Sequence, residues 1–108
     1  MAYFLLQGAY TAEAWGTLVN NPTDRVEAIR PVVERLGGSV ENAFFSFGDY
    51  DVVLILRMPD NVSAAAFSLA VAAGGAFKSH KTIPLMSIEE GVAAMRKAGD
   101  TGYNPPGK

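Results

Sequence analysis

The chain has 108 residues, the size of one ordinary domain, so a single hydrophobic core is expected. Hydrophobic residues make up 49% of it and charged residues 19%, which excludes a largely disordered protein. The formal charge of -2 disfavours nucleic acid and anionic membranes as partners. With no cysteine and one histidine the chain has neither thiolate nor multi-histidine metal sites, so we expect no metal and no cofactor.

The first predicted element is a buried strand within residues 2–10. Residues 3–6 form a short apolar run that ends at a glycine-containing stretch, a pattern that favours a strand over a helix. No basic segment precedes the run and Gln7 interrupts it, so it makes a poor signal peptide and a poor membrane span. We therefore expect a cytoplasmic protein without a membrane partner.

Helical segments follow this strand. Thr11 is placed to cap a short helix that carries Trp15. A longer helix is predicted to begin with Asn21 as its cap and Pro22 at its first position, and to end at a pair of glycines. Pro31 lies inside this helix and removes one backbone donor, so a kink is expected there. The apolar face of the helix consists of Val26, Ile29, Val33 and Leu36.

Two strands joined by a tight turn come next. Residues 39–47 mix valine, phenylalanine and polar residues in rough alternation, and residues 51–58 are strongly apolar. Gly48 and Asp49 between them have the chemistry of a turn, so we expect a β-hairpin.

The last part of the chain contains a helix, a strand and a second helix. An alanine-rich helix is predicted for about residues 62–73, and its small side chains allow it to lie close to the sheet. Residues 77–85 are predicted to form a strand that Pro84 places at an edge. Ser87 and Glu90 have the spacing of a capping box at the start of a helix that ends before Gly99.

This order of elements predicts the fold class. Strand, helix, strand, strand, helix, strand is the βαββαβ order of ferredoxin-like α+β domains, here with an extra C-terminal helix. We assign residues 1–98 to this domain and residues 99–108 to a flexible, turn-rich C-terminal tail.

The strand at residues 51–58 is apolar on both of its sides. Because side chains alternate along a strand, one side carries Val52, Leu54 and Leu56, and the other carries Val53, Ile55 and Arg57. The helices of a ferredoxin-like fold cover only one face of the sheet, so a second layer must bury the other. We predict a homodimer through the exposed sheet face. The alternative is that the last helix folds over that face within one chain.

The turn before this strand carries a family resemblance. The residues GDYD at 48–51, preceded by RLGGSVENAFFSF and followed by VVLILRMPD, resemble the signature of the GYD domain family. The resemblance extends over residues 3–95 and includes LGG before the second strand, PD after the third, and EE at the start of the last helix. It implies a dimeric α+β barrel of ferredoxin-like topology, from a family with no established activity.

The same turn is the first candidate ligand-binding site. A sharp turn at Gly48 exposes backbone donors, and Asp49 and Tyr50 offer hydrogen bonding and proton transfer. The alternative interpretation is purely structural: Gly48 supplies a positive φ, Asp49 bonds to its own turn, and Tyr50 packs under the helices.

Three further side chains are candidates for ligand binding. His80, the one histidine, is suited to proton transfer if it reaches a pocket between sheet and helices, but its polar neighbours favour a solvent-facing place at a sheet edge. Trp15 either walls an aromatic pocket or packs in the core or a dimer contact. Gln7, a polar amide in an apolar strand, needs a partner in a pocket, across a dimer or on neighbouring backbone.

Two functions are compatible with these features. The first, which we favour, is a small dimeric binding or interaction module that holds a small apolar or aromatic ligand. The alternative is a cofactor-independent oxygenase or isomerase that acts on a small aromatic or apolar substrate. In that enzyme His80 or Asp49 acts as the base, and Tyr50 or Trp15 positions the substrate. A cavity with an inward-facing group of shifted pKa would favour the enzyme.

Overall fold

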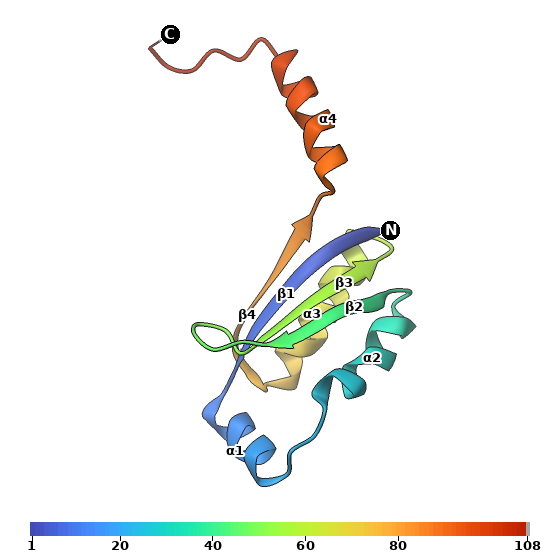
Figure 1. The fold of residues 1–108 in the computed structure, drawn as a ribbon, viewed down its shortest axis with the longest axis vertical. Helices are drawn as coiled ribbons and strands as arrows, with labels where there is room; N and C mark the ends of the chain where they lie inside the picture. Colours follow the sequence, from blue (N-terminus) through green and yellow to red (C-terminus); the bar gives the residue numbers. More distant parts are fainter. Residues whose placement is uncertain (108) are drawn as a thin grey trace.

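The strands predicted from the sequence form one antiparallel sheet in the computed structural model, which describes residues 1–107 (Figure 1). They are β1 (Ala2–Tyr10), β2 (Ser39–Phe45), β3 (Val52–Met58) and β4 (Phe77–Leu85), in the spatial order β2-β3-β1-β4. β1 and β3 are therefore central, and β2 and β4 are the edges. This is a ferredoxin-like α+β arrangement, so the predicted fold class and the edge position of Pro84 are confirmed.

The helices that accompany the sheet are α1 (Ala12–Asn20), α2 (Arg25–Arg35), α3 (Asn61–Gly74) and α4 (Ile88–Gly99). The predicted caps are confirmed for α1, where the Thr11 side chain accepts a backbone hydrogen bond, and for α4, where Ser87 and Glu90 form a capping box. α3 begins after Asp60 and ends at Gly75, whose φ of 74° suits glycine. No helix within residues 1–107 has both the length and the apolar character needed to cross a membrane.

The start of α2 differs from the prediction. Asn21 does not cap the start of α2. It ends α1 instead, where its backbone N–H donates to the Thr17 carbonyl. Asp24 is the cap: its Oδ1 accepts hydrogen bonds of 3.0 and 3.3 Å from two amides of the first turn. The helix therefore begins at Arg25 rather than at Pro22, and it continues through Pro31.

The core lies between the sheet and the helices α2 and α3. Alternate side chains of β1 and β3 are buried on this side, as strand geometry requires, so the predicted alternation along β3 is confirmed. The largest fully buried side chains are Leu6, Val33, Leu54, Leu56, Met58 and Phe67.

The uncovered side of the sheet, which we call the open face, is mainly apolar. Directly paired residues in an antiparallel sheet share a face, so the register assigns its members. They include Tyr3, Leu5, Gln7, Ser39, Asn42, Phe44, Val53, Ile55, Arg57, Lys81, Ile83 and Leu85. Phe44 is 62% exposed there. A contiguous apolar surface of this kind is uncommon on a monomer.

α4 does not cover the open face. It continues from the end of β4 and points away from the rest of the chain (Figure 1), and none of its residues is buried. The chain has a radius of gyration of 17.5 Å, whereas a compact domain of this length has about 13 Å. The alternative in which the last helix folds over the sheet within one chain is therefore wrong.

Candidate functional site

Asp51, the last residue of the GDYD turn, holds that turn in place. Its Oδ2 accepts hydrogen bonds from the Tyr10 amide at 2.9 Å and from the Trp15 indole Nε1 at 3.1 Å. The Asp51 amide donates to the Gly8 carbonyl at 2.8 Å, and its carbonyl accepts from the Ser46 amide at 2.8 Å. The turn thereby fastens the start of β3 to β1 and α1, which is a structural task.

The other residues of the turn do not converge on a common point. Gly48 has a φ of 142°, which supports the structural interpretation. Asp49 is exposed, and the side chain that bonds within the turn is that of Ser46, whose hydroxyl donates to the Tyr50 carbonyl at 2.7 Å. The Tyr50 ring lies 5.6 Å from Nζ of Lys81, an open-face residue, so Tyr50 does not pack under the helices.

His80 lies on the edge strand β4, with its ring towards α3. Its Nδ1 is 3.5 Å from Oγ of Ser68, which also accepts a hydrogen bond of 3.1 Å from the Thr82 hydroxyl. The ring is half-buried and does not face solvent as expected, because the register places His80 opposite Gly8 on the helix-covered side. No carboxylate among residues 1–107 is hydrogen-bonded to the ring, so no catalytic triad is assembled.

Aromatic side chains gather where β1 meets α1. The Tyr10 ring stacks on Phe77 with centroids 4.5 Å apart, and it meets Trp15 edge-on at 5.2 Å. Phe45 lies 6.3 Å from Trp15. We call Tyr10, Trp15, Phe45 and Phe77 the aromatic cluster. Gly8 makes room for it, because a Cβ at that position would stand 2.5 Å from the Phe77 ring.

A cavity of about 70 Å³, which we call the inner cavity, lies beside this cluster and is lined by the sheet, α2 and α3. Its wall includes Leu6, Leu54, Phe67, Val71 and Phe77, and the polar groups on it belong to Tyr10 and Arg25. Burial raises the pKa of Tyr10, and the nearby Arg25 charge opposes this only in part. The phenol is therefore protonated at neutral pH.

An open cleft of about 390 Å³, which we call the outer cleft, lies against α1. Tyr10, Arg25 and Ala76 line both the outer cleft and the inner cavity, so they form the boundary between the two spaces. The charged side chains that line the outer cleft are Arg25 and Glu13, which belongs to the first turn of α1. The inner cavity is thus mainly apolar, and the adjoining outer cleft carries both polar and apolar side chains.

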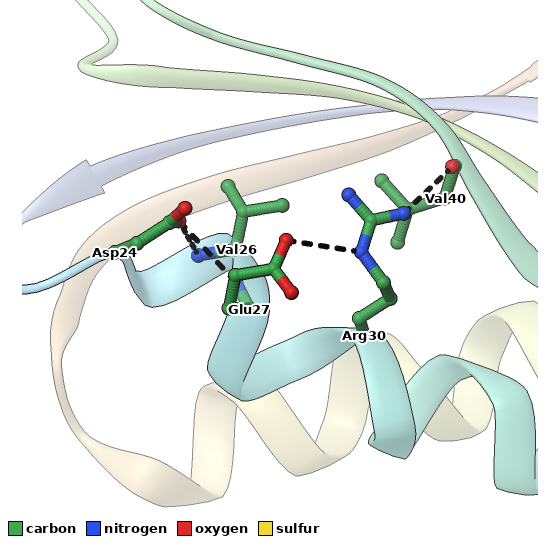
Figure 2. A network of polar contacts seen from close by, with 5 residues as sticks. All are labelled: Asp24, Val26, Glu27, Arg30 and Val40. Carbon is green, nitrogen blue, oxygen red and sulfur yellow. Dashed lines mark hydrogen bonds and ion pairs between the residues drawn. The ribbon is translucent and has the colours of Figure 1, made fainter.

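A larger groove of about 670 Å³ lies between the start of α2 and β2. Three of its charged side chains are bonded to one another or to the backbone, as Figure 2 shows. Asp24 caps α2, Glu27 pairs with Arg30 Nε at 3.3 Å, and Arg30 Nη1 donates to the Val40 carbonyl at 3.3 Å. These groups already serve the fold, so the groove is a weaker candidate than the inner cavity.

The open face holds two polar side chains that lack partners within residues 1–107. The half-buried Gln7 makes no side-chain hydrogen bond there, and Nε of Arg57 is buried without an acceptor. The Arg57 guanidinium lies 5.5 Å from the Tyr3 ring centroid. Buried polar groups in folded proteins are nearly always paired, so we expect these groups to find partners outside the chain.

Sequence reasoning finds only part of this site. Trp15 belongs to the aromatic cluster beside the inner cavity but lines neither that cavity nor the outer cleft. The other predicted residues, Gln7, Gly48, Asp49, Tyr50 and His80, line neither space either. Sequence reasoning does not find Tyr10 and Arg25. The available signal was weak: Tyr10 ends an apolar strand beside the Thr11 cap, and Arg25 becomes conspicuous only once α2 is known to begin there.

Comparison with known protein families matches residues 4–95 of the 108 to the family described as GYD domain. No curated protein and no solved structure matches the chain.

Proposed function

We propose that this chain, which belongs to the GYD domain family, is a homodimeric module that binds a small apolar ligand in the inner cavity. The observation that carries the proposal is the cavity itself, an apolar space of about 70 Å³ with polar groups only from Tyr10 and Arg25. Ligand sites are typically apolar hollows with a few placed polar groups. An interior built for stability alone would be better filled, because an empty cavity destabilises the fold.

Binding is favoured over catalysis by the chemistry of the cavity wall. An oxygenase or isomerase without a cofactor needs a base that faces its substrate. A tyrosine is protonated at neutral pH, and burial raises the pKa of Tyr10 further, so Tyr10 can donate a hydrogen bond but cannot act as that base. His80 is turned towards Ser68 and does not line the inner cavity. The enzyme alternative therefore has no base at the place where the ligand would lie.

The homodimer is proposed to form through the open face. Two copies related by a twofold axis would bury this apolar surface on both chains at once. They would also bring acceptors and donors to Gln7 and to the buried Nε of Arg57. α4, which points away from its own domain, is free to pack on the partner.

The binding proposal is tested by titrating the full chain with 1-butanol, a small neutral probe, while recording methyl NMR spectra. We expect saturable shifts of the Leu6, Leu54 and Val71 methyl groups, which line the inner cavity. Val71→Phe should fill the cavity and abolish the shifts. Val62→Phe on the same helix, where the side chain is 79% exposed, is the matched control and should retain them. Absence of saturable shifts in the parent protein would show that the inner cavity binds no such ligand.

A further inference from the structure

We infer that the natural ligand is a short-chain aliphatic monocarboxylate, with its alkyl group in the inner cavity and its carboxylate bound to Arg25 at the boundary with the outer cleft. This rests on the proposed function, because it requires the inner cavity to be a ligand site. The size of the cavity, the position of the cation and the neighbouring acidic residue each restrict the ligand.

The inner cavity is too small for an aromatic ring. An apolar protein cavity of about 150 Å³ holds one benzene molecule. The inner cavity, at about 70 Å³, has roughly half that volume. It therefore suits an alkyl group of on the order of three or four carbon atoms. Apart from Tyr10 and Arg25, the side chains that line it are hydrocarbon, so the inserted part of the ligand must be hydrocarbon too.

Arg25 supplies a positive charge where this alkyl group would emerge. It lines both spaces, and no carboxylate among residues 1–107 lies within 4.0 Å of it. The next arginine of α2, Arg30, is instead paired with Glu27. A guanidinium binds a carboxylate through two parallel hydrogen bonds, which fixes its orientation as well as its charge. The Tyr10 hydroxyl, at the same boundary, is a further donor.

Glu13 limits the ligand to one negative charge. It lines the outer cleft but not the inner cavity, so it stands farther from the boundary than Arg25 does. A single carboxylate that stays at the boundary meets Arg25. A second carboxylate or a phosphate that extends into the cleft meets the Glu13 charge and is repelled. A monocarboxylate is therefore favoured over a dicarboxylate or a phosphate ester.

Three probes with chains of four carbon atoms differ in charge: butanoate carries one negative charge, succinate carries two, and 1-butanol carries none. In calorimetric or NMR titrations of the full chain, we expect butanoate to bind at least about tenfold more tightly than 1-butanol, because a charged hydrogen-bonded pair adds this much. Succinate should bind more weakly than butanoate. Hexanoate, whose chain exceeds the inner cavity, should also bind more weakly.

Arg25→Gln should lower the affinity for butanoate by about tenfold or more relative to the affinity for 1-butanol, which carries no charge for Arg25 to bind. Arg30→Gln removes the same charge from the same helix, outside the site, and should change neither. Glu13→Gln should raise the affinity for butanoate severalfold. The circular dichroism of each variant establishes that it is folded.

The outcomes distinguish the two levels of the proposal. Equal affinities for butanoate and 1-butanol, or an unchanged butanoate affinity in Arg25→Gln, overturn the carboxylate inference and leave the inner cavity as a site for a neutral ligand. If neither butanoate nor 1-butanol binds the parent protein, the proposed function is itself wrong. If Arg25→Gln does not fold, Glu13→Gln decides, and a failure to raise the butanoate affinity overturns the inference.

Discussion

One carboxylate oxygen of Asp51 accepts hydrogen bonds from both the Tyr10 backbone amide and the Trp15 indole. This carboxylate therefore connects the start of β3 to β1 and α1. Asp51→Ala removes both hydrogen bonds and leaves the amide of the buried Tyr10 unpaired. We expect the free energy of unfolding in urea to fall by about 2 to 3 kcal/mol. Asp49→Ala, at an exposed position two residues earlier, should change it by less than about 0.5 kcal/mol. Equal losses in the two variants would contradict the role of Asp51.

Two glycines with open surroundings should respond to alanine in opposite directions. A Cβ at Gly48 or at Gly16 would meet no atom within 4 Å, so only the backbone decides. Gly48 has a φ of 142°, and Gly48→Ala should destabilise the protein by about 1 to 3 kcal/mol. Gly16 lies inside α1, and Gly16→Ala should stabilise it by about 0.5 to 1 kcal/mol. Thermal unfolding of both variants checks the signs, and a shared sign would show that one assignment is wrong.

At the scale of residues, the sequence predicts what depends on near neighbours. The positive φ of Gly48 and the Thr11 and Ser87 caps follow from residues a few positions away, and all three are present. The hydrogen bonds of Asp51 are different, because their partners lie 36 and 41 positions away. Only the register of β1 against β3 brings those groups together, so no local pattern predicts them.

At the scale of elements, substitutions in α4 test the proposed dimer separately from the fold of one chain. Ile88 and Met95 are 87% and 71% exposed on this projecting helix. The double variant Ile88→Ser, Met95→Ser should therefore leave unfolding of the individual domain nearly unchanged, within about 0.5 kcal/mol. It should raise the dimer dissociation constant about tenfold in sedimentation analysis, because apolar contacts with the partner are lost. Val19→Ser in α1, also highly exposed, is the control. An unchanged dissociation constant would exclude α4 from the interface.

Acid should loosen the N-terminal ends of α3 and α4. Hydrogen bonds from the amides of Ser63 and Ser87 lower the pKa values of Asp60 and Glu90 below their ordinary range. A carboxyl group whose pKa is lower in the folded than in the unfolded state stabilises the fold, and this stabilisation is complete above the unfolded-state pKa. It is lost as the pH falls through the lower, folded-state pKa. We therefore expect helical ¹³Cα shifts in both first turns to decline below about pH 4. The first turn of α1, capped by a hydroxyl group of Thr11 that does not titrate, should show no such decline.

The helix boundaries also show where element prediction fails. Asn21 and Asp24 are both good N-cap residues, and the sequence alone favours the first because a proline follows it. In the folded chain Asn21 is already used to close α1, so Asp24 caps α2. Both helices can use Asn21 as a cap, and its use at the end of α1 decides where α2 begins. The sequence of either helix alone does not show this.

At the scale of the whole molecule, substitutions at two adjacent residues of β3 should affect folding and the proposed dimerisation separately. Leu54 faces the core and is 2% exposed, so Leu54→Asp should prevent folding, because it buries an unpaired charge. Ile55 lies on the open face, and Ile55→Asp should give a folded protein of the monomer mass, 11.5 kDa, in light scattering. The parent protein should have twice that mass. A folded Ile55→Asp variant that keeps the parent's mass would exclude the open face as the interface.

The apolar character of both faces of the sheet could be predicted from the sequence, whereas the inner cavity could not. Side chains of β3 point alternately to the two faces of the sheet, so the residues on each face can be read directly from the sequence of this one segment. The inner cavity is lined by residues from α2, α3 and every strand of the sheet, including Leu6, Ile29, Phe45, Leu54, Val71 and Phe77. The cavity exists because these side chains, packed together in three dimensions, leave a space between them. The order of residues in the sequence does not reveal such a space.

The central place of β1 in the sheet has a consequence for the newly made protein. Residues 2–8 pair with residues 52–58 on one side and later with β4 on the other, so of the four strands β1 waits longest after its synthesis for a first neighbour. At a translation rate of about 5–20 residues per second, β1 waits roughly 2–10 seconds for β3. During this interval its apolar side chains and unpaired backbone groups are exposed to other nascent chains and to chaperones. The yield of the folded protein should therefore be sensitive to the speed of synthesis between β1 and β3.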